Sequence, residues 1–306
     1  MFEWRRHVTL KGWARGKRSA GNGDAVNQGA ARDQASPVGR AFAENATPDM
    51  VRVHLASTIE GEIIPRLLLT HQAPWGRVGP PGNLRKPDSE DIIDFCASVL
   101  RDDGSASMYL ESWVLDGATF EYICTELLAP AARHFGDLWL NDLLDFTDVT
   151  IGTWRLQQLM RDMSIAIPAE AGLEDPRKRI LLSTTPGEQH SFGLSMVAEF
   201  FRRDAWEVTL LAKADEESLV HAMRDEWYAV VGLSLSAEQR IPELRKAIAS
   251  MRAGARNRDM PIFVGGRVFT ETPALAFELG ADAVAVDAED AVRKARGFLR
   301  RANWLS

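Results

Sequence analysis

The sequence has few cysteines and no long apolar run. Only two of the 306 residues are cysteines, Cys96 and Cys124, and they are far apart and lack metal-binding spacing. No stretch approaches the ~18 apolar residues of a membrane helix. The basic N-terminus is not followed by the apolar segment of a signal peptide. We therefore expect a reduced, cytoplasmic protein with no membrane partner.

The chain also lacks the basic surplus that is typical of proteins whose binding depends on phosphate contacts. Its net charge is −7, although its first 20 residues are basic. A basic tail can still meet an acidic partner or assist weakly on DNA. Direct DNA contact is thus possible in principle, but it is not favoured.

Glycine and proline divide the chain into three parts. Residues 1–55 are expected to form a basic, largely flexible segment, because 18–50 have the small, polar, Gly- and Pro-containing composition of a linker. Residues 56–170 carry apolar stripes at helical spacing, including one over Ile59–Leu68, and predict a helical bundle. In it, Thr119 is expected as an N-cap, and Trp113 and Trp154 as core aromatics.

Residues 178–301 alternate between short apolar runs and amphipathic helices. Strands are expected at 180–183, 207–211, 229–234, 262–265 and 283–286, and helices at 191–203, 216–226, 238–252, 271–279 and 288–301. Five such units predict an α/β domain with a five-stranded, parallel, doubly wound, flavodoxin-like sheet.

Three segments follow strands of this expected sheet. They are Gly187–Gly193, which contains His190, then Ser234-Leu235-Ser236, and then Gly265-Gly266. Taken alone, each is ordinary: a histidine is usually a hydrogen-bonded surface residue, a serine a cap, and a glycine pair a tight turn. Because ligands of open α/β sheets bind beyond the carboxyl ends of the strands, the three together predict one cleft.

These segments resemble the D-x-H-x-x-G, S-x-L and G-G pattern of base-off, His-on cobalamin-binding domains, as in methionine synthase and corrinoid methyltransferase subunits. His190, Gly193, Ser234 and the glycine pair match, whereas Glu188 replaces the aspartate and Ser236 the leucine. The resemblance implies cobalamin as cofactor and His190 as the lower axial ligand of cobalt.

The resemblance also implies roles for the residues around His190. A carboxylate can accept the second ring N–H of a metal-bound imidazole. Glu188 is one methylene longer than aspartate, so this contact is expected to be altered or water-mediated. Gly193 would let the backbone approach the corrin, and Gln189 lies in the same loop. The nucleotide tail would enter a slot of the sheet domain formed by Ser234, Ser236, Gly265 and Gly266.

Residues 128–139 resemble the capping helix of cobalamin modules, with Trp139 over the upper corrin face. Light-sensing regulators that use adenosylcobalamin carry Glu and His after this tryptophan, and both are missing here. Water or hydroxide is therefore the expected upper ligand. A protein side chain remains an alternative, and the candidates are His7, His54, His71 and His134.

The segment Ser57–Leu69 resembles the AerR/PpaA family of photosynthesis regulators. That resemblance implies a light- or redox-responsive antirepressor in a purple bacterium, which acts on pigment genes through a repressor protein as its partner. No helix-turn-helix is recognisable, in agreement with action through a protein.

Two other functions stay open. One is a corrinoid methyl carrier of a methyltransferase system, and the other is a scaffold that has lost cobalamin. No enzymatic activity is expected, because the chain has no zinc-thiolate set and no convincing nucleophile–base set. His221 and Asp225, one helical turn apart, are expected to be a solvated pair.

Overall fold

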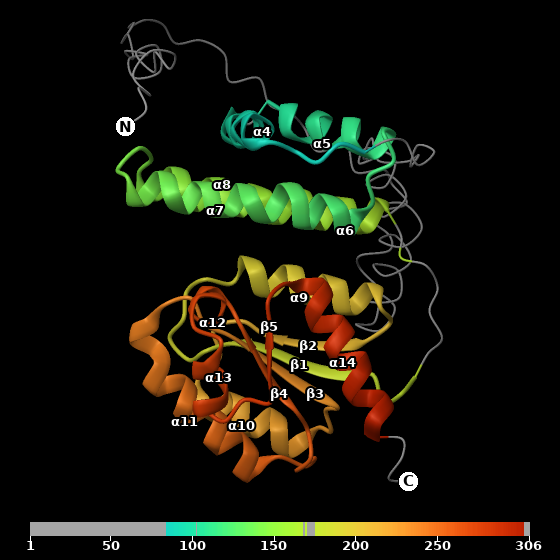
Figure 1. The fold of residues 1–306 in the computed structure, drawn as a ribbon, viewed down its shortest axis with the longest axis vertical. Helices are drawn as coiled ribbons and strands as arrows, with labels where there is room; N and C mark the ends of the chain where they lie inside the picture. Colours follow the sequence, from blue (N-terminus) through green and yellow to red (C-terminus); the bar gives the residue numbers. More distant parts are fainter. Residues whose placement is uncertain (1–83, 102, 168, 170–174, 303–306) are drawn as a thin grey trace, which may run out of the picture. The chain divides into compact units, whose positions relative to one another are not determined.

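The computed structural model describes residues 84–302, apart from 102, 168 and 170–174 (Figure 1). The basic segment 1–55 and the helix expected at Ile59–Leu68 lie outside the described residues. So do three candidate upper ligands, His7, His54 and His71. The described residues form a helical region and an α/β region, as the sequence predicts.

The helical region begins at Ser89 and ends at Ala166. Its elements are α4 (Ser89–Arg101), α5 (Ser105–Leu115), α6 (Phe120–Ile123), a π-helical turn (Cys124–Leu128), α7 (Ala129–Leu140) and α8 (Phe146–Ala166). The expected N-cap at Thr119 is confirmed, since its Oγ1 accepts a hydrogen bond from the Tyr122 N–H at 3.1 Å. Asp145 caps α8 in the same way through the Asp148 N–H.

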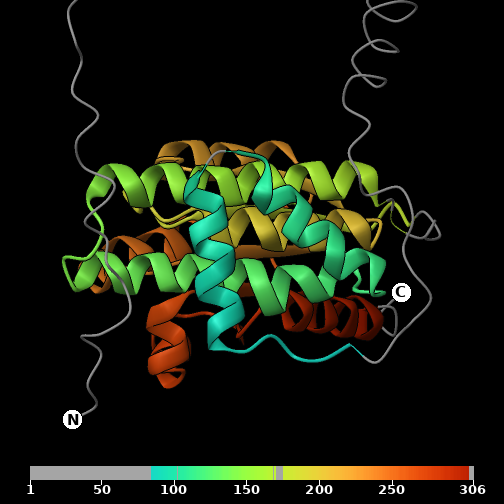
Figure 2. The same cartoon turned by 90° about the horizontal axis from the view of Figure 1, so that it is seen from above.

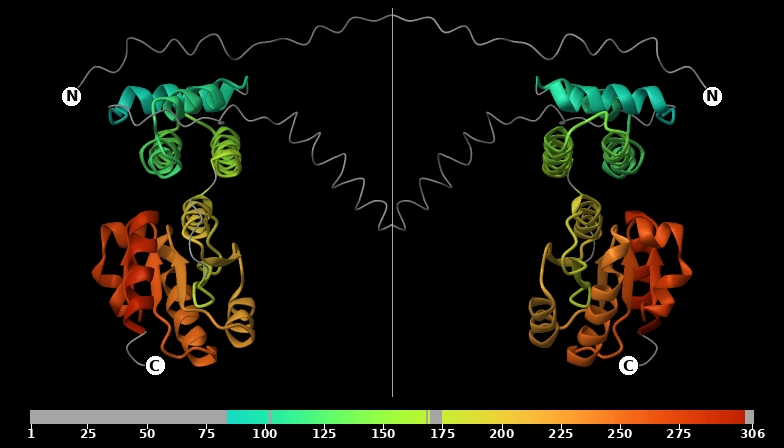
Figure 3. Two further views of the ribbon diagram at one scale, coloured as in Figure 1. Left: turned by 90° about the vertical axis from the view of Figure 1, so that its right-hand side faces the viewer. Right: turned by 90° about the vertical axis from the view of Figure 1, so that its left-hand side faces the viewer.

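The helices of this region form two layers. Helix α4 crosses α7 and α8 (Figure 2), and the views in Figure 3 show α7 and α8 end-on beside the layer of α4 and α5. Phe95 of α4, Phe120 of α6 and Phe135 of α7 are fully buried. Helix α8 approaches α7 closely at Gly152, where a Cβ atom would lie 2.8 Å from the Phe135 ring. None of the described helices combines the length and apolar character needed to cross a bilayer.

The α/β region contains one parallel sheet of five strands. They are β1 (Arg179–Thr184), β2 (Glu207–Leu211), β3 (Val230–Ser234), β4 (Ile262–Gly265) and β5 (Ala283–Ala285), arranged in the order β2-β1-β3-β4-β5. All neighbouring pairs are parallel. This is the flavodoxin-like order, which switches direction between β1 and β3, so the expected fold class is confirmed.

Helices cover both faces of the sheet. Their bounds are α9 (Phe192–Arg203), α10 (Glu216–Asp225), a 3-10 turn (Glu238–Arg240), α11 (Ile241–Gly254), α12 (Arg267–Glu271), α13 (Ala274–Glu278) and α14 (Ala288–Ala302). The single helix expected at 271–279 is wrong. Pro273 lacks an N–H and disfavours helical backbone at Thr272, so two short helices meet there.

Two apolar cores result from this arrangement. On one face of the sheet, Leu181, Val231 and Ile262 pack with α10 and α11. On the other face, Ile180, Val230 and Phe263 pack with α9 and α14, and this core continues into the helical region. Helix α9 therefore contacts both regions of the described chain.

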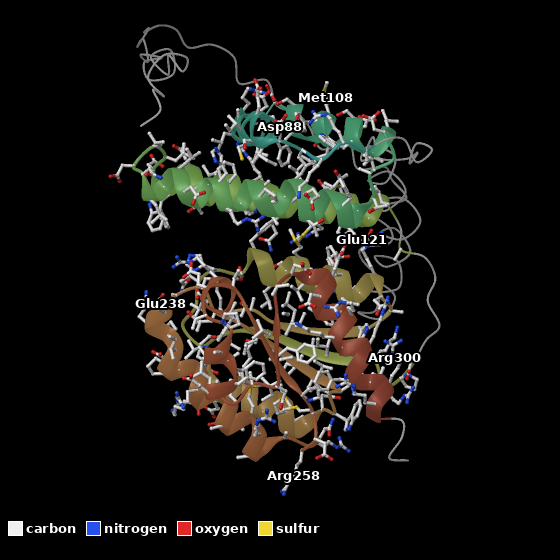
Figure 4. All side chains as sticks on the ribbon, in the orientation of Figure 1. Asp88, Met108, Glu121, Glu238, Arg258 and Arg300 are labelled. Atoms are coloured by element: carbon white, nitrogen blue, oxygen red, sulfur yellow. The ribbon has the colours of Figure 1, made fainter. Side chains whose placement is uncertain are left out.

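Polar contacts reinforce the packing of α9 on the helical region. Arg203 Nε donates to Glu121 at 2.8 Å and Arg203 Nη1 donates to the Ile167 carbonyl at 2.6 Å; Glu121 is labelled in Figure 4. The Arg203 guanidinium also lies 4.4 Å from the centre of the Phe120 ring. These contacts involve the C-terminal end of α9, while its N-terminal end follows the loop that carries His190.

Candidate functional site

The three segments singled out from the sequence meet at the carboxyl ends of neighbouring strands. Ser234 pairs with Thr184 at the end of β1 and with Gly265 at the end of β4. The loop with His190 leaves β1 directly after Thr184 and Thr185. Ser234 thus stands between the other two segments, at the point where the strand order reverses.

Glu188 connects two of these segments through its carboxylate, which is buried with 1% of the side chain exposed. Oε1 accepts hydrogen bonds from the N–H groups of Gln189 and His190, at 2.7 and 2.9 Å. Oε2 accepts from the N–H groups of Ser236 and Ala237, at 2.8 and 3.0 Å. One side chain therefore fixes the loop after β1 to the loop after β3.

Burial by itself would raise the pKa of Glu188. The hydrogen bonds donated by the backbone N–H groups of His190 and Ser236, by the His190 ring and by the Ala237 N–H outweigh it and lower the pKa to about 2. Glu188 is therefore a carboxylate at neutral pH.

The His190 imidazole is held by this carboxylate and faces solvent. Its Nδ1 lies 2.6 Å from Glu188 Oε1, and 66% of the side chain is exposed. Since a carboxylate accepts, we assign the ring proton to Nδ1, which leaves the lone pair on Nε2. The contact is direct, so the water-mediated alternative is wrong: Glu188 reaches the His190 ring and the loop after β3 together.

The remaining sequence-predicted residues border this edge in different ways. Gln189 is exposed and contributes its backbone N–H to Glu188. Gly193 is exposed in the first turn of α9, and a Cβ atom there would meet nothing within 4 Å. Ser234 is half-buried, and its carbonyl accepts from both the N–H and the hydroxyl of Thr185, each at 2.9 Å. Gly193 therefore leaves open space in the first turn of α9.

The glycine pair is explained first by backbone packing. Gly266 has φ of +103°, and a Cβ atom there would lie 2.3 Å from the Leu235 carbonyl oxygen. At Gly265 the nearest atom to a Cβ would be the Ala285 carbonyl oxygen, at 3.1 Å. Leu235, rather than Ser236, is the fully buried residue of its segment. Ser236 contributes its backbone N–H, so its difference from leucine leaves the Glu188 contact intact.

Arg240 borders the loop that carries His190, a position that the sequence did not predict. Its guanidinium lies against Gly187, where a Cβ atom would be 3.0 Å from Cζ. Gly187 has φ of +82°, so the loop turns sharply under this side chain. Arg240 Nη1 also donates to Glu243 at 2.9 Å. The only signal in the sequence is the position of Arg240 in the loop after the third strand.

The tryptophans differ in burial. Trp113 is buried and stacks on Tyr122, with ring centroids 6.4 Å apart, so its expected core role is confirmed. Trp154 on α8 is 57% exposed, and the expectation that it is a core aromatic is wrong. Trp139 is 48% exposed near the end of α7. The spacing of apolar residues predicts which face of a helix is apolar, but it does not predict which neighbouring element buries that face.

The described residues offer His190 as a candidate single metal ligand rather than a metal cage. No group of three or more His, Cys, Asp and Glu side chains in this part of the chain is placed to hold a metal ion. Such a cage is not needed where the cofactor brings its own equatorial ligands, as a corrin does for cobalt. An exposed imidazole with Nδ1 fixed by a buried carboxylate and Nε2 free fits the lower side of such a cofactor. The His221–Asp225 pair, 3.0 Å apart, is exposed as expected.

Comparison with known proteins agrees with this geometry. Residues 178–296 match the family model of the B12 binding domain. The chain is 26% identical over 167 residues to an uncharacterized 20.5 kDa protein in the bchF–crtJ intergenic region of Rhodobacter capsulatus. The matched stretch covers 55% of this chain and 86% of that protein. This similarity supports the resemblance to cobalamin-binding proteins of the photosynthesis gene region.

The fold is also found among solved structures. The monomethylamine corrinoid protein of Methanosarcina barkeri is similar with a TM-score of 0.56 at 13% identity, covering 68% of this chain and 98% of that chain. At this identity the likeness concerns the fold alone.

Proposed function

We propose that the chain is a cobalamin-dependent regulator that responds to light or redox state, on the premise that residues 178–296 match the B12 binding domain. The observation that carries the proposal is the His190 imidazole, exposed at Nε2 and fixed at Nδ1 by the buried carboxylate of Glu188. The regulatory part is supported by the similarity to the protein of the bchF–crtJ region.

In this proposal His190 would hold cobalt through Nε2. Gln189 and Gly193 would border the corrin, and Ser234, Ser236, Gly265 and Gly266 would lie beside the nucleotide tail. Trp139 would cover the cofactor from the helical region. When bound, cobalamin supplies a cobalt centre with an exchangeable upper ligand, here water or hydroxide. Glu188 keeps the imidazole in the Nε2-binding tautomer.

A short hydrogen-bonded path links this site to the helical region. Ser195 donates to the carbonyl of Ser191, the residue after His190, through its N–H at 2.9 Å and its Oγ at 3.1 Å. Gln157 on α8 donates to Ser195 Oγ at 3.1 Å. A change at the ligand loop would thus reach α8 through two side chains. Movement of α8 would then change the surface that the partner meets.

The proposed partner is a repressor protein of photosynthesis genes, and the chain acts as its antirepressor in the cytoplasm. Direct DNA contact is not favoured, because the net charge is −7. We propose no enzymatic activity. The strongest acid–base pair suggested by the sequence, His221 with Asp225, lies exposed on one helix face.

The test is an absorption titration of the full chain with hydroxocobalamin, in darkness and under light. His190→Ala is expected to lose the spectrum of the histidine-ligated form. His221→Ala is the matched control, since it removes another exposed histidine that pairs with a carboxylate. A His190→Ala protein with the wild-type bound spectrum would refute the ligand assignment. Equal repressor affinity in apo, dark and light states would refute the switch.

A second candidate is a corrinoid methyl carrier, because the fold is shared with a monomethylamine corrinoid protein. Transfer of the methyl group from bound methylcobalamin to a thiol or folate, in the presence of a partner enzyme, would support this function over regulation.

A further inference from the structure

Helix α8 has described neighbours on three of its sides. It approaches α7 at Gly152, and Arg155 Nη1 donates to two backbone carbonyls of α4, at 3.0 and 2.8 Å. Gln157 Nε2 donates to Ser195 Oγ on α9 at 3.1 Å. Figure 3, in which α8 is seen end-on, shows these neighbouring helices around it. One side of α8 is left without a partner among the described residues.

This remaining side of α8 carries exposed apolar side chains. Ile151 is 38% exposed, Trp154 is 57% exposed and Ile165 is 71% exposed. Gln158, which is half-buried, and Arg161, which is exposed, lie between them on the same side. We call these five residues the outer stripe. From Ile151 they follow one another in steps of three, four, three and four residues, which is the spacing of the a and d positions in a coiled-coil seam. The pattern is typical of a helix that packs against another helix.

The charges of the helical region favour the outer stripe as a surface for self-association. Residues 84–167 contain 15 Asp and Glu but only six Lys and Arg. Two copies that met through most of this surface would place carboxylates against carboxylates, which opposes association. The outer stripe holds one arginine and no carboxylate. A second copy of the chain can therefore approach along this stripe without like-charge repulsion between acidic residues.

We infer that the outer stripe packs against the outer stripe of a second copy of this chain, with the two α8 helices antiparallel. Centred on the middle of residues 154–165, this packing places Trp154 of one copy against Ile165 of the other and Gln158 against Arg161. Each end of the seam is then apolar, and its middle holds two polar pairs. A parallel arrangement would instead place Arg161 against Arg161 and align the two helix dipoles, so it is disfavoured. The inference goes beyond the proposed function and does not depend on cobalamin.

The size of the outer stripe sets the strength of this dimer. A stable protein interface buries about 800 Å² on each partner. The outer stripe offers only the exposed parts of five side chains on one helix. The dimer is therefore a transient one, and we expect its dissociation constant to be on the order of micromolar.

The experiment is sedimentation velocity of the full chain at concentrations from below to above this expected Kd. The mass should rise from the 33.9 kDa of one chain toward twice that value. Trp154→Lys and Ile165→Lys should each raise the dimer Kd at least about tenfold, because each places an ammonium group in the seam. Met108→Lys on α5 and Phe277→Lys on α13 are the matched controls, at apolar side chains that are 68% and 60% exposed. Their Kd should stay within about twofold of wild type, and all four variants should fold because the replaced side chains are exposed.

Gln158→Glu tests the direction of the two helices. In the antiparallel dimer the new carboxylate faces Arg161 of the other copy, so the Kd should fall about threefold through two exposed ion pairs. In a parallel dimer it would face the same carboxylate of the other copy, and the Kd would rise. A rise for Gln158→Glu would therefore overturn the antiparallel arrangement. A mass of 33.9 kDa at every concentration, or a Trp154→Lys Kd within about twofold of wild type, would overturn self-association through the outer stripe and leave this surface to a different protein.

Discussion

Neutralising Glu188 should destabilise the protein, because its carboxylate is buried and accepts five hydrogen bonds. Three reach Oε1 from Gln189 and from the backbone and ring of His190, and two reach Oε2 from Ser236 and Ala237. In Glu188→Gln, one of these oxygens becomes an NH₂ group that faces N–H donors. At least two donors then lose their acceptor, at about 1–3 kcal/mol each.

The pKa leads to a similar magnitude. The pKa of Glu188 falls from 4.5 to about 2 on folding, because its hydrogen bonds outweigh the effect of burial. At ~1.4 kcal/mol per pKa unit, the charged form contributes about 3 kcal/mol to the free energy of unfolding at neutral pH. Since the folded pKa is depressed, this contribution is complete above pH 4.5 and is lost as the pH falls toward 2.

The assay is urea unfolding of wild type and Glu188→Gln from pH 7 down to pH 3. We expect a difference of about 3 kcal/mol at pH 7 that shrinks toward pH 3, because below pH 4.5 Glu188 takes up a proton in the unfolded chain while the folded carboxylate stays ionised. Glu217→Gln, at an exposed position on α10, is the control and should change stability by less than about 0.5 kcal/mol. A Glu188→Gln difference below about 1 kcal/mol, or one independent of pH, would refute the reasoning.

Three further substitutions test the surroundings of the site. Gly266→Ala should cost more than about 2 kcal/mol in thermal unfolding, because φ is +103° and the Cβ atom would lie 2.3 Å from the Leu235 carbonyl oxygen; an unchanged Tm would contradict this. In Gly193→Ala the added methyl group would lie in open space, so the free energy of unfolding should stay the same or rise by up to ~1 kcal/mol, while the Kd for hydroxocobalamin rises. An unchanged Kd would show that Gly193 does not contact the corrin. Arg203→Ala removes the contact with Glu121 and should lower the free energy of unfolding by about 3 kcal/mol and speed hydrogen exchange in α8. Unaltered exchange in α8 would show that the packing of α9 on the helical region does not need Arg203.

Local pattern was sufficient for the architecture of the sheet domain. The spacing of apolar residues within each strand or helix is a local property that distant residues hardly change. All five strands were therefore predicted to within one or two residues of their observed bounds. Parallel strands place their carboxyl ends along one edge. The meeting of His190, Ser234 and Gly265 therefore followed from topology alone.

Prediction was poorer where a local feature competes with a periodic one. The helix expected at 271–279 is interrupted at Pro273, although its apolar residues keep helical spacing. Trp154 lies in an apolar stripe and was expected in the core, yet it is largely exposed. An apolar stripe shows that a helix is amphipathic, but whether each residue of the stripe is buried depends on how far the neighbouring helix extends.

What the sequence by itself determined is the fold class and the residues that could meet a cofactor, because these depend on periodicity and on the order of parallel strands. Only the tertiary structure decided how the site is held. Glu188 reaches the N–H groups of Ser236 and Ala237, 48 and 49 residues away, while it holds the His190 ring. Gly266 is a glycine because the Leu235 carbonyl occupies the space of its Cβ. Both contacts join segments distant in the chain, and no local pattern contains them.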